Sequence, residues 1–139
     1  MREDCQGPAE PTAVREGYAT VIPTAKVVLA EVANGLGFDR QTYTERIDAS
    51  MVERVANVLF AAELPVACAE AERFESYRQH VDAAVISLGA APAEMVCWHH
   101  ARVAQVIIAA GYHDAEEATS EVVRRAAFNR CYRPIIEGD

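Results

Sequence analysis

The stretch 92–110, PAEMVCWHHARVAQVIIAA, decides the fold that we expect from the sequence. When it is drawn as a helix, apolar side chains surround it almost completely, and a helix that is hydrophobic on all sides is usually a buried one. Pro92 suits the first position of a helix, and Gly111 suits the position that follows its end. We therefore predict a central, buried helix over about 92–110.

Helical patterns also extend to both sides of this stretch. Over about 66–88, apolar residues recur every three or four positions, and charged pairs occupy the opposite side. Ser50 and Glu53 form a capping box for a helix that ends near Pro65, where the chain either kinks or starts the next helix. Further helical stretches are predicted over 12–22, 24–36 with Pro23 as the interruption, 39–47 and 114–131.

Together these patterns predict an all-α protein, a single compact domain of five or six helices packed around the central apolar helix. We expect this helical bundle to span 12–134, after a flexible N-terminal lead at 1–11 and before a short C-terminal tail at 135–139. A chain of 139 residues has room for one such domain, and it can bury a sizeable core without added cross-links.

Charge narrows the range of partners. The chain carries 13 basic and 21 acidic residues, for a formal charge of −8, so direct binding to nucleic acid is not expected. Positive charge is nevertheless concentrated near the C-terminus, at Arg124, Arg125, Arg130 and Arg133. We interpret these arginines first as partners of a helix dipole, and alternatively as a patch that binds an anion or another protein.

The cysteines and the apolar runs indicate the compartment. Cys5, Cys68, Cys97 and Cys131 form no Cys-x-x-Cys motif, which excludes a zinc ribbon and a thioredoxin-type centre. The first residues lack the apolar core of a signal peptide, and no apolar run reaches the length of a membrane span. We expect a cytoplasmic protein with reduced thiols and no membrane attachment.

One short segment could carry chemistry. On a helix, Glu94 and Cys97 would share a face, and so would Cys97 and His100. These residues could ligate a metal such as zinc, or Cys97 could act as a nucleophile with His100 as its base. Because a fourth ligand and an oxyanion hole are both lacking, we assign no metal, cofactor or catalytic residue. The sequence leaves open whether Cys97, His99 and His100 are structural or functional.

Two functional hypotheses follow. The leading one is a non-enzymatic interaction module, a small regulator, adaptor or inhibitor that forms a homodimer through apolar residues such as Ile135 and Ile136. Its acidic faces could imitate a phosphate backbone for a nucleic-acid-handling protein, and they comprise Glu70, Glu72, Glu75, Glu116, Glu117 and Glu121. The alternative is a small ligand-, metal- or thiol-dependent protein with a site at Cys97 and His100.

Overall fold

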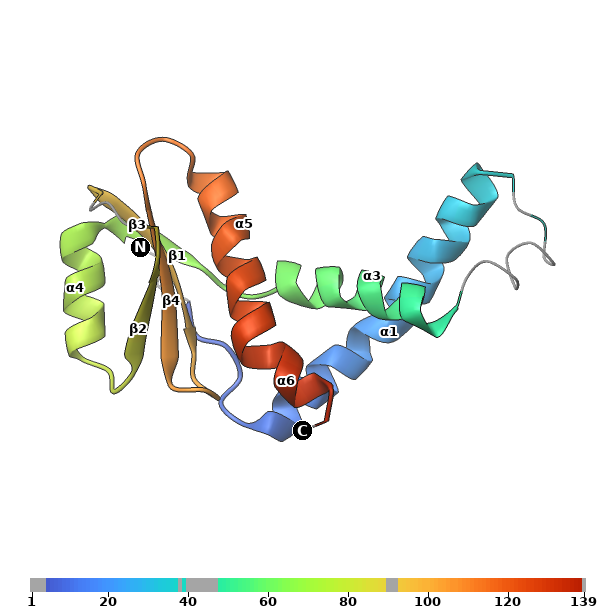
Figure 1. Ribbon diagram of the computed structural model, residues 1–139, viewed down its shortest axis with the longest axis horizontal. Coiled ribbons are helices and arrows are strands. Elements are labelled where there is room, and N and C mark those ends of the chain that lie inside the picture. Colours follow the sequence, from blue (N-terminus) through green and yellow to red (C-terminus); the bar gives the residue numbers. More distant parts are fainter. Residues whose placement is uncertain (1–4, 38, 40–47, 90–92, 139) are drawn as a thin grey trace.

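A computed structural model of the chain describes residues 5–37, 39, 48–89 and 93–138 (Figure 1). These residues form a four-stranded mixed sheet with helices on both of its faces, and two further helices extend away from the sheet. The fold is therefore mixed α/β, and the prediction of an all-α bundle of five or six helices is wrong.

The stretch predicted as a central helix forms the two central strands of the sheet. These are β3 (Met95–Ala101) and β4 (Val106–Tyr112), which pair antiparallel along their whole length. Gln105, in the turn between them, has a left-handed φ of 54°. A strand that is covered on both faces is apolar at almost every position, so hydrophobic periodicity alone does not distinguish it from a buried helix.

The helix predicted over about 66–88 is also wrong, because this segment forms a strand, a helix and a second strand. They are β1 (Ala67–Glu70), α4 (Ala71–Gln79) and β2 (Ala84–Leu88). The strand order is β1-β3-β4-β2, in which β1 is antiparallel to β3, and β2 is parallel to β4. Pro65 lies just before β1, so it separates a helix from a strand.

The helical predictions near the two ends of the chain fall on helical residues. The observed helices are α1 (Pro11–Gly35), α3 (Ala49–Ala62) and α5 (Glu116–Ala127). After α5 come a π-helical turn η1 (Phe128–Tyr132) and the short helix α6 (Arg133–Ile136). Among the described residues, none of these helices is both long and apolar enough to cross a bilayer.

Two details of the helical predictions need correction. Pro23 lies inside α1, which continues past it as one helix and is not interrupted there. The N-cap of α3 is Asp48, whose side chain accepts a 3.0 Å hydrogen bond from the amide of Met51, so Ser50 is not the cap. The predicted helix over 39–47 lies outside the described residues except for Asp39.

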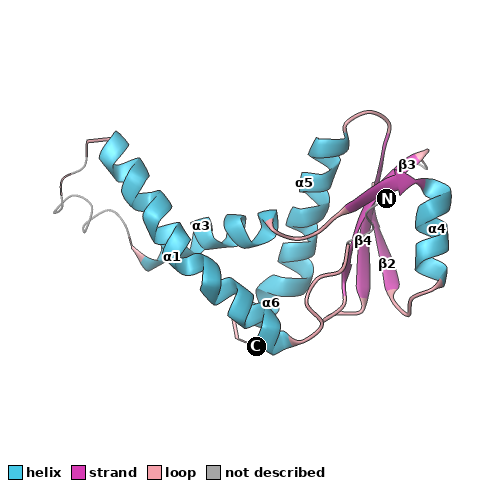
Figure 2. Cartoon of the chain, turned by 180° about the vertical axis from the view of Figure 1, so that it is seen from behind, coloured by secondary structure: helices cyan, strands magenta, loops and turns pink. Residues whose placement is uncertain are grey.

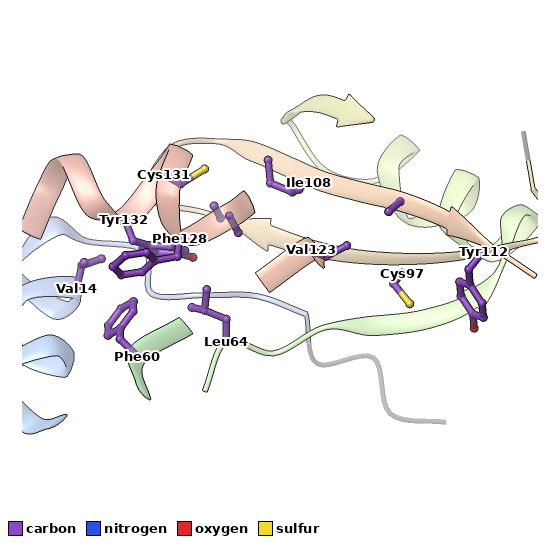
Figure 3. Packing of buried hydrophobic residues seen from close by; sticks show 13 residues of the cluster. Val14, Phe60, Leu64, Cys97, Ile108, Tyr112, Val123, Phe128, Cys131 and Tyr132 are labelled. Carbon is purple, nitrogen blue, oxygen red and sulfur yellow. The ribbon is translucent and has the colours of Figure 1, made fainter. Parts of the chain in front are cut away.

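The sheet separates two apolar clusters, with α5 on one face and α4 on the other (Figure 2). Because side chains alternate along a strand, Cys97 and His99 of β3 face the α5 side, and Trp98 and His100 face the α4 side. The larger cluster continues from the sheet to α1 and α3, where Phe60 packs against aromatic residues of η1 (Figure 3).

Part of the segment 1–11 also joins the sheet. The amide of Gly7 donates to the carbonyl of His100 at 2.9 Å, and the amide of His100 donates to the carbonyl of Cys5 at 2.7 Å. Gln6 thereby forms a parallel bridge with His100, beyond the part of β3 that pairs with β1. The segment that we expected to be a flexible lead thus has three residues placed against β3.

Candidate functional site

Two cysteines face each other across the β1–β3 pair. Cys68 on β1 and Cys97 on β3 occupy opposite positions in the antiparallel register, with their Cα atoms 4.1 Å apart, and a disulfide joins them. They are 29 residues apart in the sequence, which is why no short cysteine motif indicates the pair. The other two cysteines, Cys5 and Cys131, are buried and take no part in a disulfide.

A single hydroxyl group lies close to both sulfur atoms. The Oγ of Ser120, on α5, is 3.3 Å from Cys68 Sγ and 3.6 Å from Cys97 Sγ. Ser120 is only 8% exposed, and its hydroxyl contacts both sulfurs. A hydroxyl donor interacts more strongly with a thiolate than with a neutral sulfur. The site can therefore stabilise the reduced pair as well as hold the oxidised one.

The pair is reached from outside through Cys68. Cys97 is completely buried, whereas Cys68 is partly exposed and lines a hollow of about 500 Å³ between β1 and α5. In Figure 3 the side chain of Cys97 lies at the Tyr112 end of the larger cluster, away from the aromatic rings near η1. The rim of the hollow carries three carboxylates and one guanidinium, from Glu116, Glu117, Glu121 and Arg124.

His99 has a structural role on the α5 face. Its Nδ1 lies 2.7 Å from the carbonyl oxygen of Pro65, and its Nε2 lies 2.7 Å from the hydroxyl of Tyr132. Because a carbonyl oxygen only accepts, Nδ1 carries a proton, so that the neutral imidazole accepts at Nε2 from the hydroxyl of Tyr132. Burial raises the pKa of Tyr132, so its hydroxyl keeps the proton that it donates. His99 thus connects β3 to the end of η1.

His100 makes the corresponding connection on the α4 face. Its Nδ1 shares a 2.6 Å hydrogen bond with the hydroxyl of Tyr77, which also accepts from the Gln6 amide at 3.2 Å. Burial, and after it the charge of Arg102, lowers the pKa of His100, and burial is the main cause that raises the pKa of Tyr77 to about 12. Both groups are therefore neutral near pH 7.

The structure does not bring the sequence candidates together. Cys97 and His100 lie three positions apart on a strand, so their side chains face opposite sides of the sheet. Glu94 is exposed and precedes β3, where its carbonyl accepts from the amide of Ala71 at 2.8 Å. Within the described part of the chain, no three His, Cys, Asp or Glu side chains are arranged to hold a metal ion.

The proposed interaction residues are also dispersed. Glu72 and Glu75 lie on α4, whereas the acidic residues of α5 lie across the sheet from them, and Glu70 ends β1. All six carboxylates are exposed, but they do not form one continuous face. Ile135 and Ile136 are half-buried and pack against the larger apolar cluster of the molecule itself.

The fold and the site define a small mixed α/β protein with a cysteine pair across two neighbouring strands. The chain belongs to the family described as a family of unknown function (DUF5809), whose model matches residues 5–133. No curated protein and no solved structure matches it. The family therefore contributes no activity, and any functional proposal depends on the chemistry of this chain.

Proposed function

We propose that this protein is a redox-responsive thiol protein, in which the bond between Cys68 and Cys97 forms and breaks in use. The observation that carries the proposal is the pair itself, two opposed cysteines of which one is reachable through a hollow. It develops the hypothesis of a thiol-dependent protein, with Cys68 rather than His100 as the partner of Cys97. In the cytosol, where we expect the protein, disulfides of this kind are usually transient and catalytic or sensing.

The reaction is thiol–disulfide exchange with a small disulfide, RSSR. The Cys68 thiolate attacks one sulfur of RSSR, the S–S bond of RSSR breaks, and one RS⁻ leaves. The Cys97 thiolate then attacks Cys68 Sγ, which forms the Cys68–Cys97 bond and releases a second RS⁻. The protein dithiol is oxidised, RSSR is reduced to two RSH, and the two cysteine protons end on the two products. Reduction of the protein follows the same steps in reverse.

The surroundings assign different roles to the two sulfurs. Cys68 is the one that an outside reagent reaches, and Cys97, which is buried behind it, resolves the mixed disulfide. Ser120 donates to whichever sulfur carries negative charge during the exchange. The carboxylates of Glu116 and Glu117 at the rim repel anionic reagents, so neutral and cationic small disulfides are the favoured reactants.

Alkylation and peptide mapping test the pairing directly. The protein is oxidised with the neutral reagent hydroxyethyl disulfide, unfolded, alkylated and digested. We expect a peptide that links Cys68 to Cys97, alkyl groups on Cys5 and Cys131 alone, and alkylation of all four cysteines after dithiothreitol. The Cys131→Ser variant is the matched control and should keep the linked peptide. A stable mixed disulfide on Cys68, or a link that involves Cys5 or Cys131, would refute the proposal.

A second candidate function is self-association, which keeps the homodimer of the leading sequence hypothesis. The observation that favours it is an apolar stripe on the C-terminal half of α1, where side chains are exposed on a helix that extends from the sheet (Figure 1). The stripe comprises Val27, Val28 and Val32 of α1 and Leu36, the C-cap residue of the helix. A second copy of the same arm would cover this stripe, because paired helices of two chains can pack as a four-helix bundle.

A further inference from the structure

A groove between α3 and the segment α5–η1–α6 is positively charged, although the protein as a whole carries a charge of −8. Its volume is about 380 Å³, and its apolar surface comes from Val58, Ala61 and the buried ring of Phe128. The charged side chains that line it are four arginines and one glutamate, namely Arg54, Arg124, Arg125, Arg133 and Glu121. Three of the four C-terminal arginines that stand out in the sequence are thus joined here by an arginine of α3.

Two of these arginines already form hydrogen bonds or ion pairs within the protein. Arg124 Nε donates to the carbonyl of Leu64 at 2.8 Å, and Arg124 also pairs with Glu121 at 3.1 Å. Arg133 Nε pairs with Glu137 at 2.8 Å. In contrast, the guanidinium groups of Arg54 and Arg125 form no hydrogen bond or ion pair within the described residues. They come from different helices and border the same groove, where their charges repel each other unless an anion lies between them.

We propose that this groove binds a small organic anion, one that carries a carboxylate or phosphate head group and an apolar tail. A planar guanidinium pairs with two oxygens of such a head group at once, and the apolar surface beside it accepts the tail. The volume falls within the range of small-molecule sites, which is about 300–1,000 Å³. A second observation points to the same place: Phe128 begins the π-helical turn η1, and such turns inside helices occur frequently at functional sites.

The proposal is independent of the cysteine pair, because the groove shares only Arg124 and Glu121 with the hollow at Cys68. Calorimetric titration of the full chain tests it with decyl phosphate below its micelle concentration and with inorganic phosphate. We expect decyl phosphate to bind at least about tenfold more tightly than inorganic phosphate. If decyl phosphate and inorganic phosphate bind equally well, the groove attracts only the charge of the head group, and the proposal is overturned. The absence of binding would overturn it as well.

Variants locate the site. The Arg54→Gln/Arg125→Gln protein should bind decyl phosphate at least about tenfold more weakly than the wild type. Arg15→Gln/Arg130→Gln is the control, since it removes the same charge from exposed arginines that do not line the groove. Val58→Asp, at a side chain that is 67% exposed, should also abolish binding without unfolding the protein. Unchanged affinity in Arg54→Gln/Arg125→Gln, or an equal loss in the control, contradicts the proposal.

Discussion

His99 and His100 are neighbours in the chain but connect opposite layers of the molecule. His99 bonds to Tyr132 in the larger cluster, and His100 bonds to Tyr77 of α4. Both imidazoles are buried, and each forms a hydrogen bond with a tyrosine hydroxyl in the interior. At the scale of the residue, the histidines therefore connect the sheet to its covering helices, and the proposed chemistry of this region falls to the sulfurs of Cys68 and Cys97.

Acidification should destabilise the protein through His100. In the folded state its pKa lies below the ordinary 6.5, mainly because of burial, so the unfolded chain binds a proton that the folded chain does not. The contribution of His100 to stability is therefore complete above about pH 6.5 and is lost as the pH falls through the lower, folded-state pKa. Urea unfolding, followed by the fluorescence of the single, buried Trp98, measures this loss.

The substitution His100→Gln isolates the effect. The free energy of unfolding of this variant should depend less on pH than that of the wild type between about pH 7.5 and about pH 5. His113→Gln, at an exposed position, should keep the wild-type dependence. If both variants retain the same slope, His100 does not titrate as the structure indicates.

At the scale of the element, the N-terminal segment is positioned by close packing. A Cβ atom at Gly7 would collide with the hydroxyl of Tyr132 and lie 3.1 Å from the ring of His99. Only glycine therefore allows this segment to pass over the bond between Tyr132 and His99. The segment pairs with the end of β3 that extends beyond its pairing with β1.

Gly7→Ala should destabilise the protein by about 1–3 kcal/mol, because the added methyl group forces Tyr132 away from Nε2 of His99 and leaves that buried nitrogen unpaired. Gly35→Ala is the matched control, since no atom lies within 4 Å of its added Cβ and alanine is the better helix former. Urea denaturation of both variants measures the difference. Equal stability of Gly7→Ala and the wild type would show that the segment does not pack over His99.

The elements also show what the sequence can predict. Helices with one apolar face and one polar face, such as α3 and α5, are recognised because their periodicity differs from that of a strand. The segment 95–112 was assigned to a helix because strands that are covered on both faces show no alternation. The strand over 84–88 lies at the edge of the sheet and is only partly buried, but a run of five residues is too short for its period to be distinguished.

Because the segment around Cys97 was assigned to a helix, the candidate site could not be recognised from the sequence. On a helix Cys97 would face His100, whereas on a strand it faces Cys68, and the register that pairs them depends on contacts between distant segments. The identity of Cys97 as a candidate was available from the sequence, but its partner was not. The groove could be foreseen only in part, since the C-terminal arginines are visible in the sequence and their meeting with Arg54 is not.

At the scale of the whole molecule, the sheet and its covering helices hold the cysteine pair, and the arm of α1 and α3 extends from them (Figure 2). The thiol proposal concerns the first part, and self-association concerns the second. The two are separable, because the apolar stripe of α1 includes no residue that lines the hollow at Cys68.

Self-association through α1 predicts that Val32→Asp/Leu36→Asp is monomeric at concentrations at which the wild type is a dimer, because two carboxylates cannot be buried between the arms. Size-exclusion chromatography with light scattering gives the masses. Val122→Asp, which changes an exposed valine of α5, should leave the dimer intact. A monomeric wild type, or a double variant with an unchanged dimer, rules out the arm as the interface.

Cys68 and Cys97 are proposed to exchange reversibly between dithiol and disulfide. The most direct measurement is the fraction of linked protein at equilibrium in buffers of 2-mercaptoethanol and hydroxyethyl disulfide, both neutral, mixed in graded ratios and approached from both the reduced and the oxidised protein. We expect the linked fraction to follow the same curve from both directions, with a midpoint potential within about −220 to −320 mV, the span of cytosolic glutathione. A pair that stays linked across this whole range would be a structural disulfide, and a pair that never links would be two separate thiols; either result contradicts the account.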